Sequence, residues 1–373
     1  MRKKSCLTKV KTTNLKTIKR TALFINIIVA AILIIVYVSV RISPEKTLAV
    51  ALLPFVYVGL VAINLCFVIG WLFVKWKYSL ISITAILIGI KFINLIFPVT
   101  SLISAGGKTP DFKIMSYNVM VFGLYSWQDN PQIKANILKT IHSANPDILC
   151  LQEAYWNNKS KSFITLDSIA ILLETDNIYR SSIATAVGGQ NFGLATISKY
   201  PIVNTFAHKF NNSFNGFIYT DILLNKDTVR VYNLHLQSIQ LNQNDYTVIE
   251  EFAEFDDKTK IKTVLKKYLS SLKSRARQAE MVSASIDSCS YPVFVCGDFN
   301  DGPLTYTYFR ISKGLKDSFA SKGKYPGHTW DNFNIKQRIN YILFDKRYKC
   351  VSHVIIKTED SDHFAIVAGF LEK

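Results

Sequence analysis

Three long apolar runs in the first hundred residues constrain the fold of this 373-residue chain more than any other feature. The runs cover residues 22–40, 47–74 and 80–98. A helix needs about 20 predominantly apolar residues to cross a bilayer, so we predict three transmembrane helices within residues 22–100. Lys91 interrupts the third run and would have to face the helix bundle or extend toward an interface. The first run is too long for the apolar core of a cleaved signal peptide.

Basic residues are concentrated in the same part of the chain. Residues 1–100 contain 13 of the 44 Lys and Arg and a single acid, Glu45, whereas the remaining 273 residues carry a net charge of only +5. Eight basic residues precede the first run, and the loop between the second and third runs contains Lys75 and Lys77. Basic residues flanking membrane helices stay in the cytoplasm. We therefore expect an integral protein of the cytoplasmic membrane with a cytoplasmic tail, residues 1–21, and a C-terminal part outside the cytoplasm.

A linker and one large domain follow the apolar runs. We assign residues 101–110 to the linker and residues 111–373 to one α/β domain. Strands and helices within it are predicted from the spacing of apolar residues. The expected strands are 112–119, 147–153, 194–198, 217–224, 228–236, 292–297, 339–344, 350–356 and 364–371, and the expected helices are 131–143 and 248–287. Because strands outnumber helices and are joined by both hairpins and helices, we predict a mixed, two-sheet α/β sandwich with helices outside.

Polar residues suited to metal or phosphate chemistry stand at or near the ends of five predicted strands. They are Asn118, Glu153, His235, Asp298 with Asn300, and Asp362 with His363. Mg²⁺ prefers carboxylate and water ligands, and histidine can transfer a proton or contact a phosphate. Each residue alone has a structural explanation, such as a strand-end turn at Asp298 or a histidine satisfied within the core at His235. Together they favour a functional site at the edge of a sheet.

Five short motifs occur in an order that resembles the endonuclease/exonuclease/phosphatase superfamily. They are SYNV (116–119), DILCLQE (147–153), NLHL (233–236), GDFND (297–301) and SDH (361–363). The resemblance extends over roughly residues 110–372. It implies a four-layer α/β sandwich, in which two mixed β-sheets are flanked by helices, and it implies in-line attack of water on a phosphorus ester.

The resemblance also implies a metal ion and a substrate cleft. Glu153 is similar to the family's main Mg²⁺ ligand, with Asn118 beside it and Asp362 assisting on the metal side; Mn²⁺ is the alternative ion. Tyr155 and Trp156 directly follow Glu153 and could line the substrate cleft. Aromatic residues in such positions more often pack in the core, and the sequence leaves both interpretations open.

The remaining motif residues resemble the family's groups for proton transfer and phosphate contact. Asp298 is similar to the carboxylate that orients or deprotonates the attacking water, and Asn300 to the residue that holds a phosphate oxygen. His235 and His363 would contact the phosphate, and His363 would stabilise charge or handle a proton. The chain departs from the family at Asn340, where RIDYI is usual and RINYI stands here. An asparagine can accept a hydrogen bond from the imidazole but supplies no negative charge, so we expect weaker acid–base assistance with activity retained.

These features predict a membrane-anchored, Mg²⁺-dependent phosphoester hydrolase whose catalytic domain faces outward. Its substrate could be nucleic acid, a phospholipid head group or a small phosphoester, and the modest charge of the C-terminal part does not select nucleic acid. The alternative is a catalytically weak or inactive membrane-tethered protein that uses the same sandwich for binding. No protein partner is indicated, and the spacing of Cys289 and Cys350 does not show whether they pair.

The predicted topology can be tested in intact cells. Three crossings from a cytoplasmic N-terminus leave every residue beyond 101 exposed to the outside, so externally added protease should cleave the C-terminal part. Cleavage is detected with a C-terminal epitope, and a cytoplasmic protein serves as the control for cell integrity. Full protection of the epitope until the cells are lysed would overturn the outward orientation.

Overall fold

The computed structural model describes residues 2–99, 101, 108–126, 130–159, 163, 165–211, 213–225, 227–241, 245, 258–332 and 335–372, with side chains from residue 16 onward. The chain divides into two compact units. We call Met1–Ile93 the helical unit and Asn94–Lys373 the sandwich unit. Most of the predicted linker, 102–107, lies outside the described residues, so the linker and the domain boundaries stay predictions.

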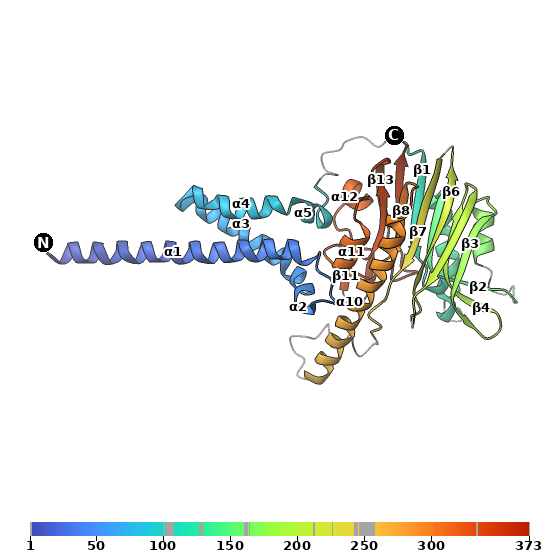
Figure 1. Ribbon diagram of the computed structural model, residues 1–373, viewed down its shortest axis with the longest axis horizontal. Helices are drawn as coiled ribbons and strands as arrows, with labels where there is room; N and C mark the ends of the chain where they lie inside the picture. Colours follow the sequence, from blue (N-terminus) through green and yellow to red (C-terminus); the bar gives the residue numbers. More distant parts are fainter. Residues whose placement is uncertain are drawn as a thin grey trace. The chain divides into compact units, whose positions relative to one another are not determined.

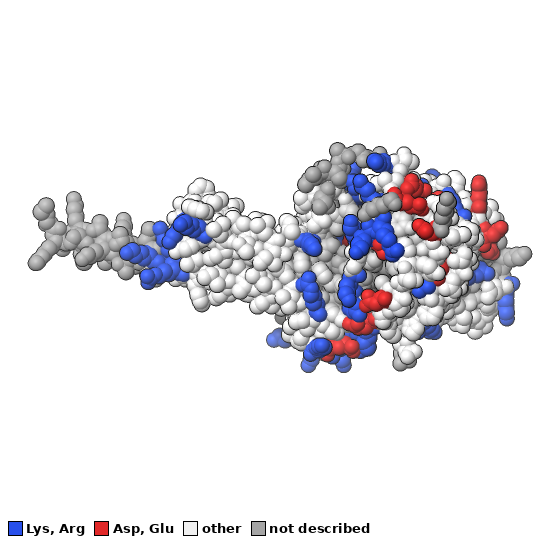
Figure 2. Space-filling view, turned by 45° about the horizontal axis from the view of Figure 1, so that its top comes forward, with Lys and Arg blue, Asp and Glu red and all other residues white. Residues whose placement is uncertain are grey.

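Two stretches of the helical unit are long and apolar enough to cross a membrane. They are Lys16–Ser39, within helix α1 (Arg2–Ser39), and Leu48–Val74, which comprises α2 (Leu48–Ala51), the 3₁₀ turn η1 (Leu53–Val56) and α3 (Tyr57–Val74). On the face drawn in Figure 2, basic side chains gather at one end of the described helices and an uncharged stretch follows. Two of the three predicted spans are thus present as continuous apolar segments.

The third predicted span is not one straight helix. The short turn η2 (Trp76–Tyr78) leads into α4 (Ser79–Ile88), and α5 (Ile90–Ile96) follows at a bend of 60°. The bend lies at Gly89, where an added Cβ would come within 2.0 Å of the Tyr37 ring. The Tyr37 ring therefore leaves no room for a side chain at this position. The bent pair counts as a third span only if both halves cross together.

Polar side chains inside the helical unit satisfy one another. Asn26 Nδ2 donates to Ser82 Oγ (2.6 Å), Ser82 Oγ donates to Asn64 Oδ1 (2.8 Å), and Trp71 Nε1 donates to Asn26 Oδ1 (3.0 Å). All four residues are buried. Hydrogen bonds between helices stabilise membrane bundles because hydrocarbon offers no other partner. This network ties α4 to both α1 and α3.

The sandwich unit contains two six-stranded mixed sheets. In the first sheet the order is β13 (Lys349–Ile356), β14 (Ala365–Leu371), β1 (Phe112–Asn118), β2 (Ile148–Asn157), β4 (Gln190–Ser198) and β3 (Asn177–Ala186). In the second sheet the order is β5 (Ile202–Lys209), β6 (Gly216–Leu224), β7 (Asp227–His235), β8 (Val293–Asp298), β12 (Asn340–Asp345) and β9 (Leu315–Asp317). The pairs β1–β2 and β7–β8 are parallel, and the other pairs are antiparallel.

Helices cover both outer faces of the stacked sheets. Apolar residues of α7 (Gln132–Ala144) and α8 (Leu166–Leu172) pack on the first sheet, and those of α10 (Lys258–Asp287) and α11 (Tyr306–Ile311) pack on the second. Figure 1 shows α10 and α11 along one side of the sheets. The predicted four-layer α/β sandwich is confirmed. The smaller elements are η3 (Met120–Ser126), α12 (Ser318–Lys322), β10 (Trp330–Asn332) and β11 (Ile335–Gln337).

Every second residue of the central strands points between the two sheets, and these positions change from apolar to polar along each strand. In β7 the inward residues Val229 and Val231 are followed by Asn233 and His235. In β8 Phe294 and Cys296 precede Asp298. All of these residues except His235 are buried. The gradient gives the space between the sheets an apolar half and a polar half.

Five strands were not predicted from the sequence, namely β3, β5 and the three-residue strands β9, β10 and β11. β3 and β5 stand at sheet edges, and most of their residues are exposed or half-buried. An edge strand with a solvated face lacks the apolar run that identifies a buried strand. The helix predicted at 248–287 is observed from Lys258, and residues 248–257 lie outside the described part of the chain.

Gly297 in β8 is required by the close approach of β7. Its φ is +142°, and an added Cβ would lie 2.1 Å from the Leu234 carbonyl oxygen. We predict that Gly297→Ala lowers the free energy of unfolding by at least about 2 kcal/mol, because strained backbone and steric overlap add. Gly302→Ala is the matched control, since a Cβ there meets no atom within 4 Å. Thermal unfolding followed by near-UV circular dichroism measures both; equal midpoints for the two variants would contradict this account.

Candidate active site

The polar half of the sandwich lies where the parallel strand pairs end. The carboxyl ends of β1 and β2 meet in one sheet, and those of β7 and β8 meet in the other. The register pairs His235 with Asp298 across β7 and β8, and Asp298 with Asn340 across β8 and β12. Asn118 is paired with Gln152 in the facing sheet. Residues far apart in sequence therefore share one edge of the sandwich, where α/β folds bind ligands.

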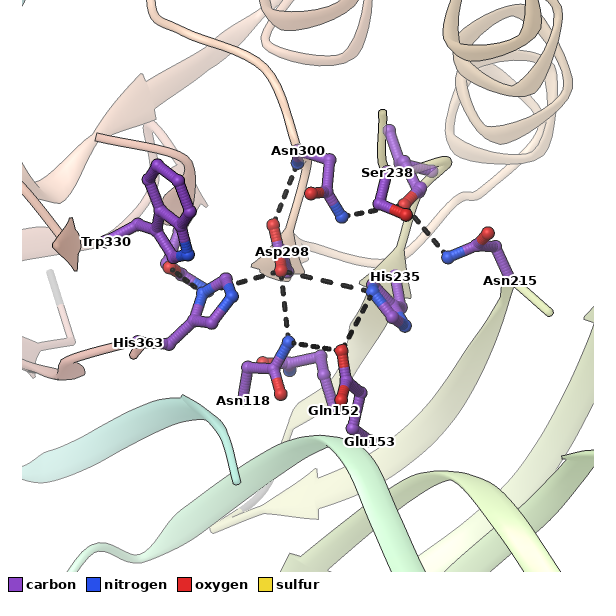
Figure 3. A network of polar contacts seen from close by, with 12 residues as sticks. Asn118, Gln152, Glu153, Asn215, His235, Ser238, Asp298, Asn300, Trp330 and His363 are labelled. Carbon is purple, nitrogen blue, oxygen red and sulfur yellow. Dashed lines mark hydrogen bonds and ion pairs between the residues drawn. The ribbon is translucent and has the colours of Figure 1, made fainter. Parts of the chain in front are cut away.

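Asp298 is the centre of this polar cluster (Figure 3). Its Oδ2 accepts a hydrogen bond from Asn118 Nδ2 at 3.1 Å and lies 3.5 Å from His363 Nδ1 and 4.0 Å from His235 Nε2. Its Oδ1 accepts from the backbone N–H of Asn300 at 2.8 Å. The side chain is almost fully buried, and among the described residues no Lys or Arg pairs with it. A buried carboxylate held only by neutral donors and histidines is suited to exchanging a proton.

Glu153 reaches the cluster from an irregular point of β2. A β-bulge lies between Leu151 and Ala154, and the φ of Glu153 is +50°. Its side chain is 37% exposed, its Oε1 accepts from Asn118 Nδ2 at 3.1 Å, and the same oxygen lies 3.7 Å from His235 Nε2. Glu153 is therefore the accessible carboxylate of the cluster, whereas Asp298 is the enclosed one.

The residues around Glu153 could hold a magnesium ion that has few protein ligands and several waters. The described residues contain no group of three or more His, Cys, Asp or Glu arranged to hold a metal. Mg²⁺ commonly uses one or two carboxylates and keeps several waters, which suits Glu153. Asn118 differs from the expectation, because its Oδ1 accepts from Met120 N at 3.1 Å while its amide nitrogen faces both carboxylates. In this arrangement Asn118 orients the carboxylates and does not direct its own oxygen to a metal.

Asp362 and Asn300 each make contacts that position neighbouring segments. Asp362 Oδ2 accepts from Trp330 Nε1 at 3.0 Å, and its Oδ1 lies 3.9 Å from His363 Nε2. Asn300 has a φ of +51°, and its Nδ2 donates to the carbonyl of Leu236 at 2.9 Å, just beyond β7. The predicted roles of Asp362 at the metal and of Asn300 at the phosphate remain predictions.

Asn340 is the hydrogen-bond partner of His363, as expected from its place in the motif. The distance between His363 Nδ1 and Asn340 Oδ1 is 3.1 Å. Asn340 Nδ2 is buried without a hydrogen-bond partner in the described part of the chain. Asp298 Oδ2 lies 3.5 Å from the same His363 Nδ1, a contact that sequence reasoning did not foresee.

Tyr155 and Trp156 lie in the core and not in an open cleft. They are 3% and 6% exposed and belong to the apolar cluster on the outer side of the first sheet. The Tyr155 ring packs against Phe163 and Phe192 at centroid distances of 5.7 and 5.4 Å. Their burial argues against the expected contact with substrate, because these two positions pack under the α7–α8 layer.

Two supporting residues escaped the sequence analysis. Asn233 stands two residues before His235, and this two-residue spacing is the signal that could have placed it on the same face. Arg275 of α10 is fully buried; its Nε lies 3.1 Å from Asp301 Oδ2, and its guanidinium donates to the Gln237 carbonyl at 2.9 Å. It thereby connects the ends of β7 and β8, and nothing in the sequence distinguished it from the helix's other basic residues.

The segment His328–Trp330, which precedes β12 in the chain, also supports the site. Thr329 Oγ1 accepts from the backbone N–H groups of Ile339 and Asn340 at 3.0 and 2.9 Å and so holds the start of β12. Burial, together with the charge of Lys357, lowers the pKa of the His328 imidazole from its ordinary value. His328 therefore tends to be neutral at neutral pH.

Cys289 and Cys350 are free thiols.

The family of the sandwich unit follows from comparison with known proteins. Residues 115–363 match the Endonuclease/Exonuclease/phosphatase family. The chain belongs to this family. Residues 19–96 match a separate domain of unknown function. The family assignment agrees with the order of the five motifs, and it gives the chain a phosphoesterase-type fold.

Individual proteins are similar to the chain in sequence or in fold. The chain is 27% identical to "Phospholipase C" of Staphylococcus aureus over 273 residues, 64% of this chain and 75% of that protein. It is 26% identical to a "Putative neutral sphingomyelinase" of Drosophila melanogaster over 208 residues, 49% of this chain and 45% of that protein. The human Nocturnin catalytic domain with bound sulfate shares the fold, with a TM-score of 0.50 and 15% identity over 72% of this chain and 97% of that one.

The Asn340–His363 contact makes a prediction about pH dependence. In Asn340→Asp a carboxylate replaces the amide oxygen beside Nδ1, so the imidazolium form of His363 is stabilised. We expect the inflection of the pH–rate profile governed by His363 to move to higher pH by about one unit. Asn340→Ser, which adds no charge, is the control. An unchanged profile in Asn340→Asp would show that His363 does not govern the inflection.

Proposed function

We propose that this protein is a membrane-anchored, Mg²⁺-dependent phosphoester hydrolase. The observation that carries the proposal is the convergence of one accessible carboxylate, one buried carboxylate and two histidines at the same edge of the sandwich (Figure 3). This set contains the groups needed to hold a cation, activate a water and contact a phosphate. Membership in the family supports the same reaction class.

In the proposed mechanism Asp298 orients the attacking water and takes its proton. His235 and His363 lie on either side of Asp298 and hold the phosphate oxygens, so charge that develops on the phosphorus centre meets hydrogen-bond donors. Glu153, with Asn118 orienting it, would hold the magnesium ion, which supplies charge neutralisation at the phosphate. His363 accepts or donates a proton through Nε2, because its Nδ1 is hydrogen-bonded to Asn340 Oδ1.

A phospholipid head group is the substrate class that the observations favour. The relatives named above include a "Phospholipase C" and a "Putative neutral sphingomyelinase". The sandwich unit lacks a strong basic excess, and Lys, Arg, Asp and Glu are interspersed on the face drawn in Figure 2. Nucleic-acid-binding domains usually carry a concentrated basic surface. Apolar helices near the N-terminus would keep the domain close to lipid substrates.

Membrane anchoring and orientation belong to the same proposal. The apolar stretches Lys16–Ser39 and Leu48–Val74 support the anchor. With the bent α4–α5 pair as a third crossing, the basic N-terminal tail stays in the cytoplasm and the catalytic domain faces outward. Two crossings alone would leave the domain on the cytoplasmic side, and the protease experiment distinguishes these arrangements.

A catalytically weak or inactive binding protein is the second candidate, and Asn340 is the observation that favours it. An asparagine there leaves a buried amide nitrogen without a partner among the described residues. The burial of Asp298, which pairs with no Lys or Arg among the described residues, favours the enzyme, because burying a carboxylate costs stability that a binding surface does not require.

Two substitutions test the proposed hydrolase. Glu153→Gln and His363→Ala in the detergent-solubilised full chain should each lower kcat/KM by about 100-fold or more, as loss of a positioned charge or proton donor does. Sphingomyelin, phosphatidylcholine, DNA and a generic phosphodiester are assayed with Mg²⁺ and with chelator. Asp345→Asn, which alters a surface ion pair with Arg347, is the control.

Each outcome of this assay has a distinct meaning. Magnesium-dependent turnover of lipid substrates that both variants lose supports the proposal, and preferential turnover of DNA would replace the substrate class. Hydrolysis that survives both substitutions would show that the assigned site is wrong. No magnesium-dependent turnover of any substrate would favour the binding protein.

A further inference from the structure

We propose that Asn233 is a positioning residue for Glu153, acting through the bulge in β2. This inference rests on the proposed function, because it assumes that Glu153 holds a cation. Asn233 belongs to β7, in the opposite sheet from Glu153, and is fully buried. It lies one inward position before His235, so it marks the start of the polar half of the sandwich.

The bulge needs an explanation because it lies inside a buried sheet. Leu151 is paired with Ala195 of β4, and the next pair is Ala154 with Gly193. Two residues of β2, Gln152 and Glu153, thus face one residue of β4. The positive φ of Glu153 is unfavourable for a residue with a side chain. Such a conformation persists only when surrounding contacts enforce it.

Asn233 contacts the bulge with its whole amide group. Its Nδ2 donates to the carbonyl oxygens of Leu151 and Ala195, at 3.0 and 2.9 Å, which form the last regular pair before the bulge. Its Oδ1 accepts from Gln152 Nε2 at 2.7 Å. One side chain from the facing sheet therefore holds both strands on one side of the bulge and the first residue within it.

Asparagine suits this position because of its particular donors and acceptor. The amide provides two hydrogens and an acceptor at the end of a short side chain. Aspartate has the same shape but cannot donate to either carbonyl, and leucine can neither donate nor accept. In both cases buried polar groups lose their partners, and the bulge is no longer held. Since Glu153 follows Gln152 directly, its carboxylate would shift relative to Asn118 and His235.

Cation affinity separates this positioning role from a purely structural one. A structural role predicts a lower unfolding temperature with an unchanged site in the molecules that remain folded. The positioning role predicts weaker cation binding by the folded protein, because losing a residue that orients a metal ligand typically lowers metal affinity by about 10- to 100-fold. The test uses Mn²⁺ as the probe, and binding is measured by electron paramagnetic resonance on the full chain in detergent.

We expect Asn233→Asp to bind Mn²⁺ at least about tenfold more weakly than the wild-type chain, at a temperature where both are folded. Asn233→Ser, which keeps one donor, should give a smaller loss. So should Gln152→Leu, which removes the contact to Asn233 Oδ1 and the Gln152 contacts to Ser116 Oγ and the Cys150 carbonyl but leaves both donor bonds of Asn233. These two milder variants decide the question if Asn233→Asp does not fold. Asp221→Asn is the matched control. Asp221 forms an ion pair with Arg230, which lies at the other end of β7, and the two N–O distances are 2.6 and 2.8 Å. The substitution should lower the unfolding temperature and leave Mn²⁺ affinity unchanged.

The outcomes separate this inference from the proposed function. Wild-type Mn²⁺ binding that all folded Asn233 and Gln152 variants retain would overturn the positioning role and leave the proposed hydrolase intact. An equal loss of affinity in Asp221→Asn would show that general destabilisation is the cause, and would also overturn it. Absence of Mn²⁺ binding by the wild-type chain would refute the cation site itself, and both proposals would fall together.

Discussion

The change from apolar to polar residues in the space between the two sheets is the constraint on which the rest of the sandwich unit depends. Apolar inward residues such as Phe294 and Cys296 drive the two sheets together at one end. Two residues beyond Cys296, β8 brings Asp298 into the same interlayer space, and four residues beyond Val231, β7 brings His235 there. The energy for burying those polar groups therefore comes from the apolar half, and packing and site are built from one alternating pattern.

A polar layer makes this change of environment tolerable. Three fully buried residues, Ser116, Gln152 and Asn233, lie between the apolar half and the polar cluster around Asp298. They form hydrogen bonds with one another or with backbone carbonyls. Buried polar groups are stabilising only when they find partners, so such a layer has one favourable arrangement. Arg275 adds a second connection outside the sheet, between the ends of β7 and β8. The site is thereby held by strands, by cross-sheet amides and by a helix.

The helical unit also satisfies its buried polar side chains with one another. Asn26, Asn64 and Ser82 would be costly in contact with hydrocarbon, and they form hydrogen bonds within the bundle instead. Their partners lie on α1, α3 and α4, so the half-span α4 belongs to the bundle. The third apolar run is bent at Gly89, where the Tyr37 ring lies against the backbone, and hydropathy reveals neither the bend nor the contact.

Most of the buried framework was predictable from the chain because its signals are local. Apolar runs and period-two patterns identified the central strands, and five motifs in order identified the family. Edge strands such as β3 were missed because their solvated faces carry no apolar pattern. The sequence left Tyr155 and Trp156 open between a substrate cleft and the core, because proximity to Glu153 in sequence does not determine the face on which an aromatic ring packs.

The sequence by itself determined the two-part organisation, the sandwich architecture and the family to which the C-terminal part belongs, since each depends on composition or on short patterns along the chain. Only the tertiary structure decided how the site is assembled. That Asp298 stands beside His363, that Asn118 presents its amide nitrogen to two carboxylates, and that Asn233 holds the bulge before Glu153 are consequences of register between strands and of contact between sheets. Such contacts join residues separated by up to 180 positions, and no local pattern encodes them.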